Sequence, residues 1–419
     1  MLIQFAAQNV LSFRDKVILS ALAAPGVTHD THHVYADPDG LNLLRVLVLY
    51  GANASGKSNV VKALAWARRL VIDGTPAGQP IVTHPFKLDQ ATRDAPSTVE
   101  FEVLADGTRY SYGFVVSQER VEGEWLYLAQ GDDEVMLFER EDGEIRLGEG
   151  LTANEERRRF IGFVAEGTRP NQLFLHETFD RAVHELNHVT EWFQDASFES
   201  TSPHDPTWPL GRFYQEDQLR TFASKLLHDA GTGVTNVEIE LIRDTLTVVG
   251  TSTHQVKRLP VTEQQVVFVH NGEQTVHFRV GEESDGTLRL LTLSPLLYDM
   301  AQARVPVSVI DEIDSSLHTL LTRHIVQTVL AMDPSQPGQL IFTTHDTNLL
   351  DLNLLTADSV WLLEKDKAGA SSLYSLAEFK ADQLDQLTGQ VERGYLQGRF
   401  GGIPFLGDPK RLGWVEGDA

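Results

Sequence analysis

The sequence predicts an α/β protein that carries an antiparallel β lobe and a helical and β insertion. The first observation is the apolar run "VLVLY" (46–50), which ends at a Gly-containing loop and is followed by a segment with helical spacing. The second is a pair of apolar strands, "VPVSVI" (305–310) and "QLIFTT" (339–344), which alternate with helical segments. The third is the succession of strands and an Asp-Gly turn across residues 98–142.

The composition is typical of a soluble globular protein. Of the 419 residues, 42% are hydrophobic and 22% are charged. No apolar run approaches the roughly 18 residues that span a bilayer, and the first residues lack a signal-peptide pattern. There are no cysteines, which excludes disulfides, thiolate zinc sites and cysteine nucleophiles. We therefore expect a cytoplasmic protein with no membrane contact.

The charge disfavours a protein that coats nucleic acid. With 35 basic and 59 acidic residues, the formal net charge is −24, which repels phosphate backbones at long range. The basic cluster Arg157-Arg158-Arg159 could make a local phosphate contact, or it could be solvated helix surface. Binding of nucleic acid stays open at this point.

The first third of the chain predicts strands around one helix. The segments "MLIQFAAQNVLSF" and "KVILSALAA" are typical of two short strands, and residues 29–40 of a polar loop. Residues 60–71 have helical spacing. Residues 98–142 then predict an antiparallel meander with a turn at Asp106-Gly107.

The remainder predicts an insertion followed by a return to α/β structure. Residues 152–232 are mostly helical, with a break at "STSPHDPTWP" (200–209). Residues 234–280 are typical of short alternating strands with a hairpin at Asn271-Gly272, and helices are expected at 285–303 and 315–332. No repeat of 20 to 50 residues and no sustained heptad pattern occurs. We expect one domain over 1–419 that is built from three parts, 1–125, 126–280 and 281–419, with the outer parts joined in one sheet.

The loop "GANASGKS" (51–58) matches a phosphate-binding loop at each fixed position: Gly51, Gly56, Lys57 and Ser58. Glycines allow consecutive backbone N–H groups to surround a phosphate, the lysine reaches the β- and γ-phosphates, and the hydroxyl ligates Mg²⁺. The following helix adds its positive N-terminal end. The alternative is an ordinary strand-to-helix turn.

Two later strands end in polar residues of matching chemistry. In "VPVSVIDEIDSS", Asp311 can hold Mg²⁺ through water, and Glu312 can orient and deprotonate the attacking water. In "LIFTTHD", the imidazole of His345 could touch the γ-phosphate. Taken alone, both are ordinary strand ends with solvated or structural side chains.

The segment "GEESDGTLRLLTLSPLL" places Ser284 and Gly286 at the start of an apolar helix, with Asp285 as a plausible cap. A helix N-terminus with a hydroxyl can bind a second phosphate. Read alone, the segment is a helix cap. Shortly before the acidic strand, it resembles the signature segment of ABC-type ATPases.

The order of these four segments resembles the ABC-type ATPase heads of RecF, SMC and OLD proteins. More closely, the chain is similar to the free-standing AAA-type ATPases of bacterial abortive-infection and phage-defence operons, such as the RloA and PARIS ATPases. The following segments carry this resemblance over nearly the whole chain: "QNVLSF" (8–13), "GANASGKSNVVKAL" (51–64), "PFKLD" (85–89), "RYSYGF" (109–114), "EWLY" (124–127), "RPNQLFL" (169–175), "EESDGTLRLL" (282–291), "IDEIDSSLH" (310–318), "TTHDTNLLD" (343–351) and "YLQGRFGGIPF" (395–405).

The resemblance implies an ABC-type P-loop head that binds ATP and Mg²⁺ and hydrolyses ATP. It implies metal ligation by Ser58 and Asp311, catalysis by Glu312 and the switch histidine His345, and a D-loop at Asp314. The implied nucleotide-loop residues are Gly51, Asn53, Ser55, Gly56, Lys57, Ser58 and Asn59.

In such heads, Ser284 and Gly286 complete the site of a second copy, so an ATP-dependent homodimer or higher homo-oligomer is implied. Ala54 departs from the pattern, because many ABC heads carry glycine there. Gln79 and Gln90 are both candidates for the glutamine of the Q-loop, and the sequence does not decide between them.

A nuclease within this chain is not expected. OLD-type relatives carry a TOPRIM nuclease that needs a glutamate followed by Asp-x-Asp, and the only Asp-x-Asp here is Asp37-Pro38-Asp39, with no glutamate before it. Residues 346–419 follow the switch histidine, fewer than the roughly 100 residues of a further domain. The resemblance therefore implies a separately encoded TOPRIM-type nuclease as a possible partner.

Three functional hypotheses remain. The first is an ATP-hydrolysing switch of an anti-phage defence system that controls a partner effector, which the acidic charge and the resemblance favour. The second is a RecF-type ATPase that recognises DNA junctions, and the third is a clamp in which ATP is structural. The histidine cluster His29, His32 and His33 is expected to be a loop without a metal-binding role. The aromatic tail near Tyr395 and Phe400 is expected to be a packed segment that turns at Gly401-Gly402.

Overall fold

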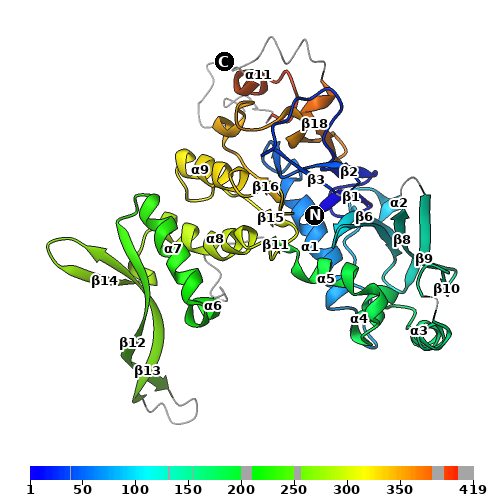
Figure 1. Cartoon of the computed structure of the whole chain (residues 1–419), viewed down its shortest axis with the longest axis horizontal. Coiled ribbons are helices and arrows are strands. Elements are labelled where there is room, and N and C mark those ends of the chain that lie inside the picture. The colour runs from blue at the N-terminus through cyan, green and yellow to red at the C-terminus, as the bar shows by residue number, and fades with distance from the viewer. Residues whose placement is uncertain are drawn as a thin grey trace, which may run out of the picture. The chain divides into compact units, whose positions relative to one another are not determined.

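The computed structural model describes residues 1–37, 39–130, 133–152, 154–199, 210–249, 256–379 and 391–403. The chain forms two compact units (Figure 1). The first unit comprises Met1–Ser200, Ala303–Ile313 and Val326–Ala419, and the second comprises Thr201–Gln302 and Asp314–Ile325. The predicted break at 200–209 lies outside the described residues.

The first unit contains an antiparallel sheet of seven strands in the order β10-β9-β8-β7-β6-β1-β2. This sheet confirms the predicted meander, and Asp106 and Gly107 form its predicted turn with φ of 48° and 71°, as in a two-residue hairpin. The strands are β1 (Leu2–Gln8), β2 (Val17–Ser20), β6 (Ser97–Ala105), β7 (Thr108–Val116), β8 (Val121–Gln130), β9 (Asp133–Glu141) and β10 (Glu144–Leu147).

The second sheet of this unit joins strands from both ends of the chain, in the order β11-β15-β16-β5-β17-β18. All neighbours are parallel except β17 and β18. The strands are β5 (Val46–Gly51), β11 (Ser197–Glu199), β15 (Ser308–Ile310), β16 (Leu340–Thr343), β17 (Val360–Lys365) and β18 (Ser371–Ser375). The sheet confirms the predicted α/β class. The predicted strand 305–310 begins only at Ser308, after Pro306, which has no N–H to donate.

Helix α1 (Lys57–Ile72) lies between the two sheets and joins their cores (Figure 1). Its buried residues occupy most of its circumference, which is typical of a helix covered on all sides. Leu47 and Leu49 of β5 and Phe101 of β6 belong to the same core cluster as Val61 and Leu64 of α1. The helix that follows the phosphate loop is therefore fixed within the core.

Shorter elements cover the edges of the first unit. The carboxylate of Glu124 is buried and accepts the amides of Phe174 and Leu175 at 2.6 and 3.0 Å, at the start of α4. These elements are β3 (Val34–Ala36), β4 (Asn42–Leu44), α2 (Gln90–Arg93), α3 (Glu155–Gly167), α4 (Phe174–Asp180), η1 (His184–Leu186), α5 (Asn187–Asp195), η3 (Thr347–Leu349), η4 (Ala357–Ser359), η5 (Leu376–Glu378) and α11 (Val391–Leu396).

The prediction of a loop over 29–40 is wrong at residues 34–36, because β3 pairs with β4 across a short turn. The polar residues around "VYA" hide a strand too short to show a clear alternation.

The second unit combines a three-stranded antiparallel sheet with helices. The prediction of short strands over 234–280 is wrong for two of them, since β12 and β13 are each 16 residues long. Pro260 does not break β13. The strand β14 pairs only with Val267–Asn271, so at Pro260 the side of β13 that faces away from β12 has no neighbouring strand and needs no N–H. The hairpin at Asn271-Gly272 is confirmed. The elements are α6 (Leu210–Gln215), α7 (Asp217–Asp229), β12 (Val234–Val249), β13 (Val256–Asn271), β14 (Thr275–Arg279), η2 (Val280–Glu282) and α8 (Asp285–Ala301).

Helix α8 confirms the predicted helix at 285–303 to within two residues. The predicted helix at 315–332 is shorter, since α9 (Thr319–Leu330) begins after a series of turns and its residues are divided between the two units. Within the described residues, none of the helices is both long and apolar enough to cross a bilayer.

Candidate nucleotide site

The phosphate loop leaves the central strand β5 and enters α1 through two glycines that the backbone requires. Gly56 has a φ of 116°, and a Cβ there would lie 2.5 Å from the Ser371 hydroxyl and 3.0 Å from that of Ser12. At Gly51 a Cβ would lie 2.6 Å from the Leu363 carbonyl. The loop is therefore packed so closely that only glycine fits at these positions.

Three polar side chains hold the loop from outside the motif. The Ser371 hydroxyl on β18 donates to the Ser55 carbonyl at 2.6 Å and contacts the Ser12 hydroxyl at 2.8 Å. The Asn59 amide on α1 donates to the same Ser12 hydroxyl at 2.7 Å. These contacts fix the loop to β18 and to the segment after β1.

The cation of the loop is buried and points back at its own backbone. Lys57 Nζ donates to the carbonyls of Gly51 and Ala52 at 2.8 and 3.2 Å. Bound phosphates would offer this ammonium stronger, charged acceptors. Lys57 is therefore placed at the floor of the loop, within reach of a nucleotide.

Ser58 and Asp311, predicted as metal ligands, meet in the structure. The Ser58 hydroxyl donates to Asp311 Oδ1 at 3.1 Å, although the residues are 253 positions apart. The Thr343 hydroxyl, fully buried at the end of β16, donates to the same oxygen at 2.6 Å. A hydroxyl and a carboxylate oxygen side by side are the hard ligands that Mg²⁺ prefers.

Glu312, the predicted base, follows directly in a strained conformation. Its φ of 49° is left-handed, which costs a non-glycine residue roughly 1–2 kcal/mol. Its amide donates to the Thr343 hydroxyl at 2.7 Å, and the next amide, that of Ile313, donates to the Thr343 carbonyl at 3.1 Å. Thr343 thus holds both acids, and strain of this kind is often found at functional sites.

His345, the predicted switch histidine, lies on the turn after β16 and is exposed. The turn is anchored at its next residue, since Tyr50 OH donates to the Asp346 carbonyl at 3.0 Å. The ring of Tyr50 also packs on Tyr395 of α11 at 5.9 Å, which agrees with the expected packed tail.

The turn at Gly401-Gly402 is also present, and the Gly402 amide donates to Glu364 at 2.6 Å. Residues 404 and 405 of the quoted tail segment are outside the described range.

These residues surround one open cavity of about 760 Å³. Its lining includes the predicted loop residues except Gly51 and Ser55, together with the predicted base and switch residues. Asp311 and the Q-loop candidates Gln79 and Gln90 are not among the residues that line it. Its lining comprises Asn53, Ala54, Gly56, Lys57, Ser58, Asn59, Lys62, Glu312, His345 and Lys365. A second cavity of about 290 Å³ shares Asn59 and Lys365 with it.

The remaining predicted residues lie in the second unit. Ser284 is the N-cap of α8 and accepts the Thr287 amide at 3.1 Å, as the cap interpretation predicts. Gly286 follows in the first turn, and a Cβ there would lie 3.0 Å from the Ser316 carbonyl. The signature and the segment after Asp314 therefore contact each other within this unit.

Several alternative candidates have structural partners. Arg157 forms a bidentate pair with Glu185 at 2.7 and 2.8 Å. Asp37 and Asp39 both pair with Arg109, at 2.7 and 3.0 Å.

The histidine cluster is similarly occupied. His29 contacts the buried Asp358 at 2.8 Å, and the rings of His32 and His33 contact backbone carbonyls. Among the described residues there is no group of three or more side chains that could hold a metal ion.

The sequence reasoning missed Thr343, Ser12 and Ser371. Thr343 precedes the switch histidine by two residues in "TTHD", and Ser12 is part of "QNVLSF", a segment to which no chemistry was assigned. For both residues, their position within or beside a recognised motif was the signal that could have identified them. Ser371 had none, because only the pairing of β18 brings it to the loop.

Comparison with known proteins gives a family. A family model described as "AAA domain, putative AbiEii toxin, Type IV TA system" matches residues 46–351, more than half of the chain. None of the curated protein sequences matches.

Three solved structures are similar in fold. A "SmcHead bound to the C-winged helix domain of ScpA" has 12% identity and a TM-score of 0.49 over 92% of this chain and 99% of that one. The SMC head of Thermotoga maritima has 14% identity and a TM-score of 0.42, covering 89% and 98%. An Smc head bound to the C-terminal domain of ScpA, derived from Pyrococcus furiosus, has 11% identity and a TM-score of 0.46, covering 93% and 99%.

Proposed function

The chain belongs to the AAA domain family of the AbiEii-toxin type, and on this premise we propose that it is an ATP-binding and ATP-hydrolysing molecular switch. One observation carries the proposal. Ser58 lines the cavity together with Glu312 and His345, and its hydroxyl is hydrogen-bonded to Asp311, which Thr343 holds from behind.

The residues present suit Mg²⁺ as the accompanying ion. Ser58 and Asp311 would hold it, and it would neutralise charge on the phosphates. Lys57 would exchange its contacts with the Gly51 and Ala52 carbonyls for the β- and γ-phosphates. Glu312, held by Thr343, would orient the attacking water and accept its proton.

The smaller cavity beside the loop suits the nucleotide base. Its walls include His84, Pro85, Phe86 and Leu88, which offer flat and apolar surfaces. Burial lowers the pKa of His84, and the charges of Arg69 and Lys87 add to this, so its imidazole is neutral at pH 7 and can stack on a purine. The two cavities together accommodate a nucleoside triphosphate.

A shared site between two copies is the finer proposal. The exposed N-terminus of α8, with Ser284 and Gly286, suits the γ-phosphate of an ATP bound to a second subunit, as the family resemblance implies. Asp314 would line the same junction. This requires an ATP-dependent homodimer or higher homo-oligomer.

We place this switch in a bacterial defence system, where it would control a separately encoded effector such as a TOPRIM-type nuclease. The family description refers to a type IV toxin–antitoxin system, which supports a role in such regulated systems. The alternative is a RecF-type ATPase that binds DNA junctions. Measurable duplex binding near physiological salt would favour that alternative over the defence switch.

A pair of variants tests the nucleotide chemistry. Lys57→Ala should abolish tight ATP binding, whereas Glu312→Gln should bind ATP normally and hydrolyse it at least about 100-fold more slowly. Fluorescent-nucleotide titration and phosphate release measure the two properties separately. Normal turnover by Glu312→Gln would show that the base is misassigned.

A further inference from the structure

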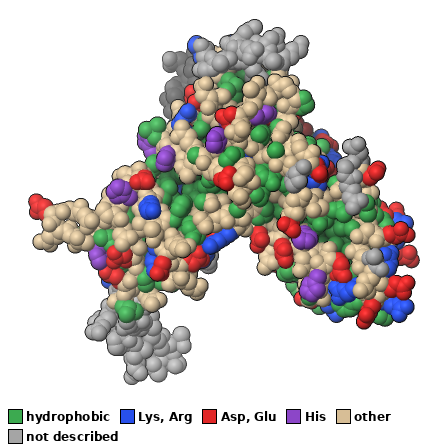
Figure 2. Space-filling model, viewed as in Figure 1, with side chains coloured by type: hydrophobic (Ala, Val, Ile, Leu, Met, Phe, Trp, Pro, Cys, Tyr) green, Lys and Arg blue, Asp and Glu red, His purple; other side chains and the backbone are tan. Residues whose placement is uncertain are grey.

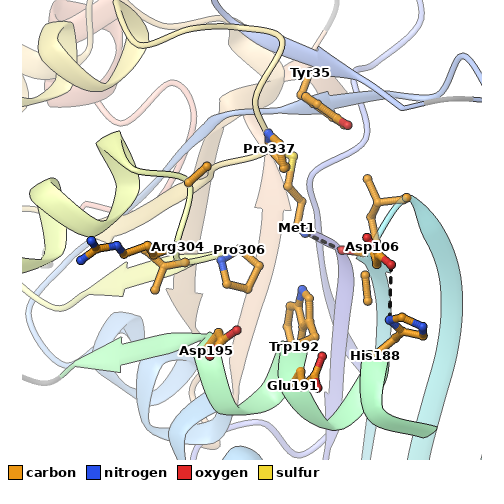
Figure 3. A pocket seen from close by; sticks show the side chains of 15 residues that line it. Met1, Tyr35, Asp106, His188, Glu191, Trp192, Asp195, Arg304, Pro306 and Pro337 are labelled. Carbon is orange, nitrogen blue, oxygen red and sulfur yellow. Dashed lines mark hydrogen bonds and ion pairs between the residues drawn. The ribbon is translucent and has the colours of Figure 1, made fainter. Parts of the chain in front are cut away.

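A separate cavity of about 520 Å³ opens on the first unit, and none of its lining residues lines the phosphate-loop cavity. It lies where β1 begins, where β6 turns into β7, and where α5 and the segment 303–306 meet (Figure 3). Its size falls within the range of small-molecule and peptide-anchor pockets, roughly 300–1,000 Å³. The proposed ATPase function assigns it no role.

The cavity is rich in carboxylates. Glu191 and Asp195 come from successive turns of α5, and Asp106 lies on the β6–β7 turn beside His188 (Figure 3). The basic groups of the lining are Arg304, His188 and the amino terminus of Met1, and burial lowers the pKa of that amine to about 5, so it is uncharged at pH 7. His188 lies 3.4 Å from Asp106. Figure 2 shows acidic side chains gathered over α5. The cavity therefore has an excess of negative charge.

The spacing of Glu191 and Asp195 is unfavourable for the helix by itself. Two like charges at i and i+4 destabilise a helix by roughly 0.2–0.5 kcal/mol. Burial and the charge of Glu191 raise the pKa of Asp195, and Arg68 lowers it. A cation bound between the two carboxylates would relieve this repulsion.

A buried donor points into the same cavity. Trp192, between the two acids in sequence, is only 3% exposed, and its indole Nε1 has no hydrogen-bond partner within the described part of the chain. Figure 3 shows its indole nitrogen directed away from α5, toward Met1. A buried indole N–H normally has an acceptor, and leaving it unpaired costs roughly 1–3 kcal/mol. The acceptor is expected to come from a ligand.

The other walls suit a long side chain rather than a bare ion. Tyr35, Pro306 and Pro337 supply flat or apolar surfaces against which the methylene groups of a basic side chain can pack. Among the described residues, no three or more His, Cys, Asp or Glu side chains come together here in a way that could hold a metal ion.

We propose that this cavity binds a basic peptide segment of a partner protein. The guanidinium or ammonium group of one side chain lies between Glu191 and Asp195, and a main-chain carbonyl of the segment accepts the N–H of Trp192. Charge complementarity identifies the occupant, because the site has both an acidic rim and an unused donor. A basic side chain flanked by peptide carbonyls satisfies both.

The probe is the blocked tripeptide acetyl-Gly-Arg-Gly-amide, and its control has citrulline, which is nearly isosteric but neutral, in place of arginine. Binding is followed by the indole ¹⁵N–¹H resonance of Trp192 in the full chain, assigned as the signal lost in Trp192→Phe. We expect the arginine peptide to shift this resonance with saturation, and the citrulline peptide to bind about tenfold more weakly.

Matched variants distinguish binding at this cavity from unspecific attraction to a negatively charged protein. The double variant Glu191→Gln/Asp195→Asn should weaken binding about tenfold, whereas Glu155→Gln/Glu156→Gln on α3 should leave it unchanged. ATP hydrolysis should be normal in all of them, which also confirms folding.

Two results would overturn the proposal. One is equal binding of the arginine and citrulline peptides. The other is a shift of the Trp192 resonance by spermidine as large as that by the peptide, which would show an unspecific acidic patch.

Discussion

In the first unit, Ser58, Asp311 and Thr343 meet through hydroxyl–carboxylate contacts beside a cavity that Ser58 lines, whereas in the second unit Ser284 is exposed and bonds to the first turn of its own helix. The first arrangement fixes Asp311 and Glu312, the proposed metal ligand and base, through the hydroxyl of Thr343. The second presents a helix N-terminus with free capacity for a phosphate. On the proposed function, the first unit would supply the residues that bind ATP, and the second would contact the γ-phosphate of an ATP bound to another copy.

Ser284 is the position where a substitution should reduce hydrolysis most. Ser284→Arg should leave ATP binding at the phosphate loop intact and reduce hydrolysis at least about 100-fold, since a bulky side chain would occupy the place of the γ-phosphate. Phosphate release over a protein concentration series measures it, and the wild type should show activity per molecule that rises with concentration. Ser335→Arg, an exposed serine that lines neither nucleotide cavity, is the control. Full activity of Ser284→Arg, or of a monomeric wild-type sample, would contradict the shared site.

The Thr343 hydroxyl is predicted to hold Asp311 and Glu312 of the first unit in place. Thr343→Val should reduce hydrolysis about 10- to 100-fold and raise the Mg²⁺ concentration needed for half-maximal rate, because the Asp311 carboxylate and the Glu312 amide each lose a partner. Thr343→Ser keeps the hydroxyl and should retain most of the activity. Unchanged kcat and unchanged Mg²⁺ dependence in Thr343→Val would show that this hydroxyl does not position the acids.

A matched pair of substitutions compares the backbones of the two regions. Gly56→Ala adds a Cβ at a φ of 116° and 2.5 Å from Ser371, so we expect a loss of about 2 kcal/mol or more in stability. Gly286→Ala gains roughly 1 kcal/mol of helix propensity against a tight contact with Ser316, so its net effect should be within about 1 kcal/mol of zero. Thermal unfolding of both variants decides this. An equal loss would mean that the two glycines are equally constrained.

The smallest effect concerns Ala54, which has a φ of 63°. Ala54→Gly relieves left-handed strain of roughly 1–2 kcal/mol but increases the entropy of the unfolded chain, which costs about 0.4–1 kcal/mol. We expect a small gain in the thermal unfolding midpoint, with ATP affinity unchanged. A clear loss of stability would show that the methyl group of Ala54 packs usefully.

The site residues that the sequence predicted are those that lie within short motifs. Gly51 to Ser58 and the pair Asp311-Glu312 were predicted because each motif is a short segment whose chemistry follows from spacing and from the strand before it. Thr343 was overlooked although it stands two residues before His345, and Ser371 could not be predicted because only the pairing of β18 brings it to the loop. The hydroxyls of Ser371 and Ser12 meet across 359 residues.

The fold shows the same limit. Strong local patterns predicted the meander, the hairpin turns and α8. The length of β12 and β13 was not predicted. Pro260 is compatible with a long β13 because β14 pairs only with Val267–Asn271, so no third strand needs an N–H at Pro260.

The central place of β5 also determines when the protein can become active during its synthesis. Its two sheet neighbours, β16 and β17, begin at Leu340 and Val360, and Ser58 must wait for Asp311, 253 residues later. At about 5–20 residues per second, the ribosome needs roughly 13 to 50 seconds for that interval. During this time the phosphate loop exists without its carboxylates, and the apolar edges of β5 are unpaired. On the proposed mechanism, a nascent or prematurely terminated chain that ends before Asp311 can contact phosphate but cannot consume ATP.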